Sequence, residues 1–346
     1  INSHGDKKTL RMAIKDLIET YGEKYPKGAA DLKRLEQIDS EKSDAFEKLK
    51  KEALLANPLL DFDRLLMGRS KKGSRFARNW QTRVDCGGSH DDELVVMTGL
   101  DEGTVETVYD PGGGKFVGDV DLHWDADKVL FTSKVDKGEL TKIPGVKSGK
   151  GYAVFELPID PKTATPAGDV RRVTPDMGCD VDNYYACYLP SGRIIFASTA
   201  AYEGVPCVGG NSYVANLYVM DNDGKNVRRL TFDQDASWHP SVMSTGRVMY
   251  TRWEYTDSAH YFSRIVMTMN PDGTDQKAYY GSNSYWPNSM FFPRQLPGPG
   301  NSTKFICTIT GHHSHSKGGA ACIFDVSQGR QEADGAVQLL GGHGEE

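Results

Sequence analysis

The first part of the chain has apolar residues at helical spacing. Leu10, Ile14 and Leu17 recur three or four positions apart in a stretch that is rich in Lys, Glu, Leu and Ala. A turn-like stretch around Pro26 interrupts this period. We therefore predict an α-helical N-terminal segment, residues 1–58, made of two or more helices. In the simpler interpretation these helices pack on the rest of the chain, and in the alternative they form a coiled-coil arm for a partner.

After about residue 60 the pattern changes to short strands separated by turns. Four segments repeat an apolar or aromatic strand, a turn with Asp, Gly or Pro, and a second strand whose apolar triplet begins at Val129, Ile194, Val248 or Phe305. Hairpins such as NLYVMDNDGKNVRRLTF follow them. A repeated four-stranded unit of this length is typical of a β-propeller blade with long loops. We predict an all-β, β-propeller domain of TolB/PD40-like four-stranded blades over residues 59–346, and we expect the natural chain to continue beyond it.

Composition narrows the classes of function. The chain of 346 residues has 47 acidic and 41 basic residues and a net charge of −6, so it lacks the basic surface that nucleic-acid binding requires. No run of about 18 apolar residues is present that could span a bilayer as a helix. The six cysteines show no CxxC or zinc-finger spacing, and their pairing stays open. We therefore expect neither a nucleic-acid partner nor a membrane span.

Strand direction indicates which loops share one face of the predicted propeller. Successive strands of a blade alternate in direction, so the loop before the first strand and the loop after the second emerge on the same side. This rule groups the starts of the first strands with three long loops, at residues 198–213, 251–263 and 308–319. The rim defined in this way collects the candidate functional residues: Asp182, Tyr185, Cys207, His239, Arg252, Glu254, His260, Trp286, His312, His313 and His315.

Four rim residues are candidate catalytic groups. His239 is a candidate general base. In the run RWEYTD, Arg252 is suited to bind an anion or carboxylate, with Glu254 as acid or base. Asp182 belongs to the same rim. The alternative is that Arg252, Glu254 and Asp257 form a structural ion-pair network that holds their loop.

Clustered histidines near the C-terminus suggest a metal site. His312, His313 and His315 lie within four positions, and alternate residues of an extended segment share a face. With His260 on the same rim, these imidazoles predict a transition-metal site, and zinc is favoured if Cys207 adds a sulfur ligand. The alternative is a solvated, glycine-rich hairpin without a metal.

Several longer runs are similar to a known family. The runs GVPCVGG, RWEYTD and SNSYWPNS, in a region from about residue 50 to 346, resemble the propeller of the hydrazine synthase alpha-subunit family. The resemblance implies the propeller part of an extracytoplasmic protein, periplasmic or secreted, that is associated with haem. Members of the family attach haem c through CxxCH motifs outside this region, and this chain has no CxxCH. The resemblance therefore implies a haem c supplied by other subunits or a C-terminal haem domain, with Cys207 beside the cofactor.

Three functions remain open on this basis. The first is an oxidoreductase component whose rim supports a haem or metal, with Cys207, Tyr185 and Trp286 as cofactor-binding residues. The second is a carbohydrate-active propeller, a polysaccharide lyase or glycoside hydrolase, in which His239 or a loop histidine abstracts a proton and Arg252 neutralises a uronate. The third is a non-catalytic binding scaffold. The scaffold would only bind a partner through the rim. A small-molecule or saccharide ligand at the rim is also expected.

Overall fold

The structure is a computed structural model. It describes residues 6–71, 90–101, 103–112, 114–135, 151–178, 181–206, 209–210, 212–255, 263–282, 284–298, 302–311 and 318–340. Two compact units are distinguished along the chain. The smaller comprises Ile1–Met67 with Val95–Thr107, and the larger comprises Gly68–Leu94 with Val108–Glu346.

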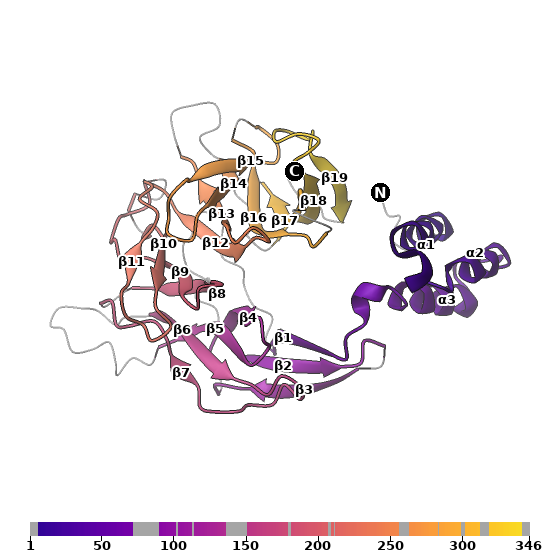
Figure 1. The fold of residues 1–346 in the computed structure, drawn as a ribbon, viewed down its shortest axis with the longest axis horizontal. Coiled ribbons are helices and arrows are strands. Elements are labelled where there is room, and N and C mark those ends of the chain that lie inside the picture. Colours follow the sequence, from indigo (N-terminus) through magenta and orange to yellow (C-terminus); the bar gives the residue numbers. More distant parts are fainter. Residues whose placement is uncertain are drawn as a thin grey trace. The chain divides into compact units, whose positions relative to one another are not determined.

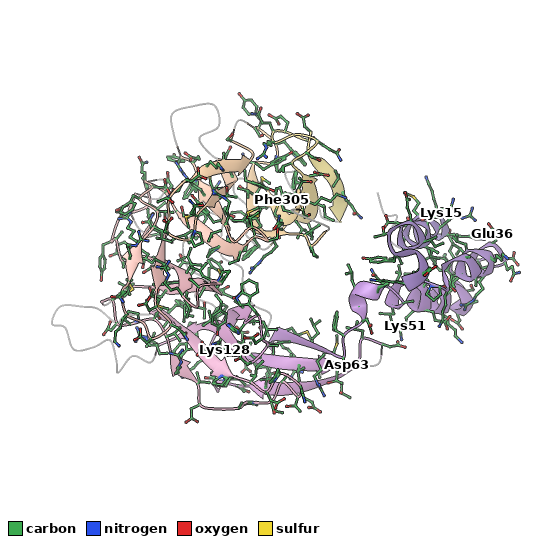
Figure 2. The ribbon with its side chains drawn as sticks, viewed as in Figure 1. Lys15, Glu36, Lys51, Asp63, Lys128 and Phe305 are labelled. Atoms are coloured by element: carbon green, nitrogen blue, oxygen red, sulfur yellow. The ribbon has the colours of Figure 1, made fainter. Side chains whose placement is uncertain are left out.

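The smaller unit contains the helices, which confirms the predicted helical N-terminal segment. They are α1 (Lys7–Tyr21), η1 (Gly22–Lys24), α2 (Gly28–Glu36), α3 (Asp44–Leu55) and η2 (Pro58–Leu60). Asp6 caps α1 by accepting a hydrogen bond from the Thr9 N–H, and Ser43 caps α3 by accepting one from the Phe46 N–H. The helices surround an apolar core of their own, formed by Leu10, Ile14, Leu17, Tyr25, Leu35, Phe46, Leu49 and Ala53. Figure 2 labels Lys15 of α1, Glu36 of α2 and Lys51 of α3 within this unit.

Short antiparallel strands make up the rest of the described chain (Figure 1). A three-stranded sheet has the order β1 (Arg64–Ser70), β2 (Asp92–Thr98), β3 (Thr104–Tyr109). Four four-stranded blades follow, each with its strands side by side in chain order. A short parallel pair between Arg264 and Ser289 joins the last two blades into one eight-stranded sheet. Blade 1 is β4 (Val117–Leu122), β5 (Lys128–Lys134), β6 (Tyr152–Pro158) and β7 (Arg171–Arg172). Blade 2 is β8 (Asn183–Tyr188), β9 (Ile194–Ser198), β10 (Asn216–Met220) and β11 (Arg228–Arg229).

The last two blades have the same design. Blade 3 is β12 (Ser237–Val242), β13 (Val248–Trp253), β14 (Arg264–Met269) and β15 (Lys277–Tyr280). Blade 4 is β16 (Ser289–Gln295), β17 (Lys304–Thr310), β18 (Ala320–Asp325) and β19 (Ala336–Leu340). The apolar triplets expected to form second strands lie in β5, β9, β13 and β17, where Phe305 is completely buried (labelled in Figure 2). The fold is therefore the predicted β-propeller, with four-stranded blades.

The inner strands of the blades lie next to one another. Figure 1 shows β4, β8, β12 and β16 on the inner side of their sheets, with β7, β11, β15 and β19 on the outer side. Contacts join β4 to β8, β8 to β12 and β12 to β16. Large side chains such as Tyr184, Trp238 and Phe291 fill the space between blades, and all three belong to one buried cluster. This packing sets the inner strands around a common interior.

A repeated threonine fixes the outer edge of the first two blades. The hydroxyl of Thr174 accepts a hydrogen bond from the Val154 N–H at 3.1 Å, and that of Thr231 accepts one from the Leu217 N–H at 2.9 Å. Both threonines are buried. Each follows an Arg-Arg pair that forms the very short outer strand, so the hydroxyl continues the sheet where backbone pairing ends.

Arginines of these outer strands connect each blade to the next. Arg171 of blade 1 donates to the carbonyl oxygen of Asn222 in blade 2 at 3.1 Å, and Arg228 of blade 2 donates to that of Asp272 in blade 3 at 2.9 Å. The acceptors lie in Asp-Gly turns. At Gly224, where φ is 80°, an added Cβ would lie 2.7 Å from the Val173 carbonyl oxygen. The turns thus dock on the preceding blade, and glycine permits the close approach.

Candidate functional site

In each inner strand, the regular pairing with the second strand of the blade is interrupted at the same position. The pairing register shifts between Gly118 and Asp121 in β4, between Tyr184 and Cys187 in β8, between Trp238 and Ser241 in β12, and between Phe291 and Arg294 in β16. Such bulges redirect side chains in a strand. At each of them one non-glycine residue adopts a left-handed backbone: Asp119 (φ 53°), Tyr185 (φ 49°), His239 (φ 54°) and Phe292 (φ 54°).

These four residues border a single cavity. Its volume is about 240 Å³, and the remaining lining residues are Val120, Ala186, Pro240 and Arg294. Every lining residue comes from β4, β8, β12 or β16, so each of the four blades contributes. Left-handed backbone is unfavourable for residues other than glycine and is concentrated at functional sites in proteins. We therefore take this cavity, the central cavity, as the candidate site.

Three rings form one wall of the central cavity. The His239 ring centroid lies 3.9 Å from that of Phe292 and 4.3 Å from that of Tyr185, and Tyr185 and Phe292 are 5.8 Å apart. The Tyr185 contacts are edge-to-face, a favourable arrangement for aromatic pairs. This packing holds the imidazole in one orientation.

Hydrogen bonding assigns the tautomer of His239. Its Nδ1 lies 3.4 Å from the hydroxyl oxygen of Thr251, and that hydroxyl donates its own hydrogen to the Met290 carbonyl oxygen at 3.0 Å. Because the hydroxyl has only one hydrogen, Nδ1 must carry the proton and donate to Thr251. In the neutral ring Nε2 is then the acceptor nitrogen, which is able to accept a hydrogen bond or a proton.

The other polar groups in and beside the cavity are Tyr185, Asp119, Arg294 and Asp121. Burial, and then the neighbouring Asp119 carboxylate, raises the pKa of Tyr185 well above its ordinary range, so its phenol stays a hydrogen-bond donor. Oδ2 of Asp119 is buried. Arg294 is half exposed, and its Nη1 lies 4.0 Å from Oδ1 of Asp121. Burial raises the pKa of Asp121, although a hydrogen bond from the Tyr188 N–H opposes this. The cavity thus combines an acid, a cation, an imidazole and a phenol.

Among the described residues that the rim argument selected, two line the central cavity. Tyr185 and His239 both line the central cavity. His239 is the third residue of β12 and is 6% exposed, so it lies inside the strand and not at its start. The bulge accounts for this position, because it turns the side chain toward the interior.

Three other predicted residues lie away from the central cavity. Arg252 pairs with Glu254 at 2.7 Å and with Asp233 at 3.3 Å, and burial raises the pKa of Glu254. The third member of the structural ion-pair alternative, Asp257, lies outside the described residues, so that alternative stays a prediction. Asp182 is buried, and its carboxylate accepts a hydrogen bond from the Tyr152 N–H of blade 1 at 3.2 Å.

Trp286 packs in the core of blade 4. Its ring centroid lies 6.1 Å from that of Phe324, and the backbone N–H of Trp286 donates to the Glu332 carboxylate at 3.0 Å. The remaining predicted residues lie outside the described part of the chain: Cys207, His260, His312, His313 and His315. Cofactor contact for Trp286 and metal binding by the histidines stay predictions.

Neither zinc nor haem fits the central cavity as the described residues form it. Zinc needs at least three protein ligands, whereas the lining offers one imidazole, His239, and one carboxylate, Asp119. Drug-sized ligands occupy sites of about 300–1,000 Å³, and a haem is larger than such a ligand. Elsewhere in the described residues one set of metal-ligating groups is gathered, His123, Asp125 and Asp127 in the turn after β4. There Nδ1 of His123 lies 3.0 Å from Asp127.

The sequence argument missed Asp119, Phe292 and Arg294. A signal for them exists in the spacing of the repeats, because Asp119, Tyr185, His239 and Phe292 occupy equivalent positions in successive inner strands. Aligning the first strands of the four units, and not only their apolar triplets, groups these residues. Arg294 then aligns with Asp121 of the first unit.

Comparison with known proteins identifies the fold. Hydrazine synthase from Kuenenia stuttgartiensis superposes with a TM-score of 0.52 and 13% identity over 76% of this chain. The chain has the fold of that propeller. It spans 37% of the hydrazine synthase chain, so the likeness covers only a part of that protein.

Two TolB structures are similar at lower scores. Putative TolB from Agrobacterium tumefaciens has a TM-score of 0.46 and 15% identity, over 82% of this chain and 91% of that chain. TolB from Acinetobacter baumannii has a TM-score of 0.43 and 17% identity, over 68% of this chain and 46% of that chain. No protein family profile and no curated protein sequence matches the chain. Among the described residues, none of the helices has the length and apolar character needed to cross a membrane.

Proposed function

We propose that this protein is a ligand-binding propeller that takes a small polar molecule into the central cavity. The observation that carries the proposal is the convergence of four left-handed residues, one per blade, on one cavity. Each such residue costs on the order of 1–3 kcal/mol. Three of the four, Asp119, Tyr185 and His239, place a polar group there.

The lining supports recognition through both hydrogen bonds and apolar contact. The Tyr185 hydroxyl can donate a hydrogen bond to a ligand, and Nε2 of His239 can accept one. The guanidinium of Arg294 is positively charged and has several N–H donors, which suits it to bind a carboxylate. Phe292 and the edge of Tyr185 provide apolar surface. Convergent polar groups in a concave, partly apolar site are the usual features of a small-molecule site.

The same geometry supports a proton transfer. Because Thr251 holds the Nδ1–H of His239, the ring is oriented with Nε2 as the group that accepts a proton from a bound ligand. A general-base role for His239 in the carbohydrate-active alternative is compatible with this orientation. Arg294, and not Arg252, would then be the cation available to a substrate carboxylate in the cavity.

A second candidate is the propeller of an extracytoplasmic redox enzyme. Its support is the likeness to hydrazine synthase in fold together with the sequence runs that resemble its alpha subunit. In this candidate the haem or metal lies outside the central cavity and is completed by other chain segments or subunits. A haem absorption band on protein purified from its native source, with intact mass, tests it, and protein that is free of haem contradicts it.

Ligand-detected NMR tests the first proposal. The probes are L-leucine, acetate, ethylamine, glucose and glucuronate, and saturation transfer is measured on wild type and two variants. His239→Asn removes the imidazole, while asparagine tolerates the left-handed backbone. His123→Asn is the matched control, because His123 lies in a turn outside the cavity lining.

We expect at least one probe to bind wild type and the control variant and to lose its signal with His239→Asn. Absence of binding by all five probes, or binding that is unchanged by His239→Asn, would contradict a ligand site in the central cavity.

A further inference from the structure

We propose that the ligand of the central cavity is an α-amino acid with an apolar side chain, bound as the zwitterion. This inference rests on the function proposed above and specifies its substrate class. It follows from three parts of the lining: a guanidinium, a carboxylate on a nearby strand, and an apolar wall between β8, β12 and β16.

The guanidinium is the carboxylate-binding end. Arg294 has one ion-pair partner among the described residues, Asp121, and the separation of 4.0 Å is too long for a hydrogen bond. Asp121 already accepts a hydrogen bond from the Tyr188 N–H at 2.9 Å. The guanidinium of Arg294 therefore retains N–H donors for a ligand carboxylate. Two of these donors can bind the two carboxylate oxygens in bidentate geometry.

The carboxylate of Asp119 is the ammonium-binding end. Asp119 belongs to the same strand as Asp121, two residues earlier, and Arg294 reaches that strand from β16. A positive and a negative group therefore both line the cavity. One anion or one cation alone would meet an unfavourable like charge there, whereas a zwitterion with adjacent charged groups pairs with both.

The rest of the lining suits an apolar side chain. Phe292, the edge of Tyr185, Val120, Ala186 and Pro240 provide apolar surface. The volume of about 240 Å³ is below the about 300–1,000 Å³ of sites for drug-sized molecules. A single amino acid matches this size, and an oligosaccharide does not.

Isothermal titration calorimetry on the full chain tests the assignment with three ligands of one skeleton. L-leucine carries both charges, isocaproate is leucine without the ammonium, and isoamylamine is leucine without the carboxylate. We expect leucine to bind wild type about tenfold or more tighter than either relative, because a hydrogen-bonded charge pair contributes at least that factor.

Two charge-removing variants separate the two ends. Asp119→Asn keeps a residue that tolerates the left-handed backbone, and it should reduce leucine to the affinity of isocaproate while isocaproate is unchanged or improved. Arg294→Gln should reduce leucine to the affinity of isoamylamine. Asp125→Asn, at an exposed site in the turn after β4, is the matched control and should change nothing.

The outcomes distinguish this inference from the function on which it rests. If isocaproate or isoamylamine binds as tightly as leucine and His239→Asn abolishes that binding, the zwitterion assignment is overturned and the ligand site stands. If leucine does not bind but glucose or glucuronate binds in a His239-dependent way, the amino-acid class is wrong. If no probe binds at all, both proposals fall. The wild-type comparison needs no variant, so it decides the matter even if a substitution prevents folding.

Discussion

The contact between the turn of blade 2 and the outer strand of blade 1 predicts a difference in stability between alanine substitutions at two glycines. Gly224 and Gly192 both lie in turns of blade 2 and share a φ of 80°. A Cβ at Gly192 meets nothing within 4 Å, whereas one at Gly224 would lie 2.7 Å from the Val173 carbonyl oxygen. Replacing each with alanine imposes the same backbone strain, so the difference in unfolding free energy isolates the contact between blades.

The expected losses follow from these geometries. Left-handed alanine costs about 1–2 kcal/mol, partly offset by about 0.4–1 kcal/mol from the stiffer unfolded chain, so Gly192→Ala should lose about 1 kcal/mol. Gly224→Ala must also move its turn away from Val173 and thereby break the two hydrogen bonds from Arg171 to Asn222. At about 0.5–1.5 kcal/mol each, these add about 1–3 kcal/mol.

Urea unfolding followed by tryptophan fluorescence measures the two variants. All five tryptophans follow residue 68 in the chain, so the signal reports on the propeller unit. Equal losses, within about 0.5 kcal/mol, would show that the turn does not dock on the preceding blade in solution.

Three further predictions test the blades and the bulges. Thr231→Val should cost about 1–3 kcal/mol in urea unfolding, because the buried Leu217 N–H loses its acceptor; a loss below about 0.5 kcal/mol contradicts this. Burial raises the pKa of Asp235 to about 6, which favours its protonated form in the folded state. That stabilisation, about 2–3 kcal/mol, is complete below the unfolded pKa of about 3.9 and is lost as the pH rises through about 6. Asp235→Asn should therefore flatten the fall in unfolding free energy between pH 4 and 6, and an unchanged slope is the contrary result. His239→Val should lower Tm more than His239→Asn, because a β-branched residue opposes a φ of 54°; equal values would refute the strained bulge.

The strands of the propeller could be predicted from sequence because their signal is local. Apolar triplets beginning at Val129, Ile194, Val248 and Phe305 alternate with turn residues, and each lies in a second strand of a blade. The helical spacing of Leu10 and its neighbours is equally local, and it produced the helices of the smaller unit. Such patterns depend on which face of an element is buried, and burial is the dominant stabilising term.

The central cavity could not be predicted in the same way, because it depends on bulges. Left-handed backbone is usually marked by glycine or asparagine, but here it occurs at Asp119, Tyr185, His239 and Phe292. Asp and His tolerate this conformation better than most residues, but the preferences of Tyr185 and Phe292 do not predict it. The packing between blades imposes it.

Tertiary contacts also decide the roles of the charged residues. The strand-direction argument grouped Asp182 with the catalytic candidates, yet its carboxylate accepts a backbone N–H from the preceding blade. Within the described part of the chain, Arg252 has two acidic partners close by, whereas Arg294 has one distant partner. Charge and sequence position alone do not distinguish these two arginines, and only their partners indicate which one is available to a ligand.

The most direct test of the central claim is a crystal structure of the full chain grown with L-leucine at a concentration that saturates binding in calorimetry. We predict leucine in the central cavity, with its carboxylate within hydrogen-bonding distance of Arg294, its ammonium beside Asp119 and its side chain against Phe292. Leucine ordered at another site, with only solvent between these residues, would contradict the account.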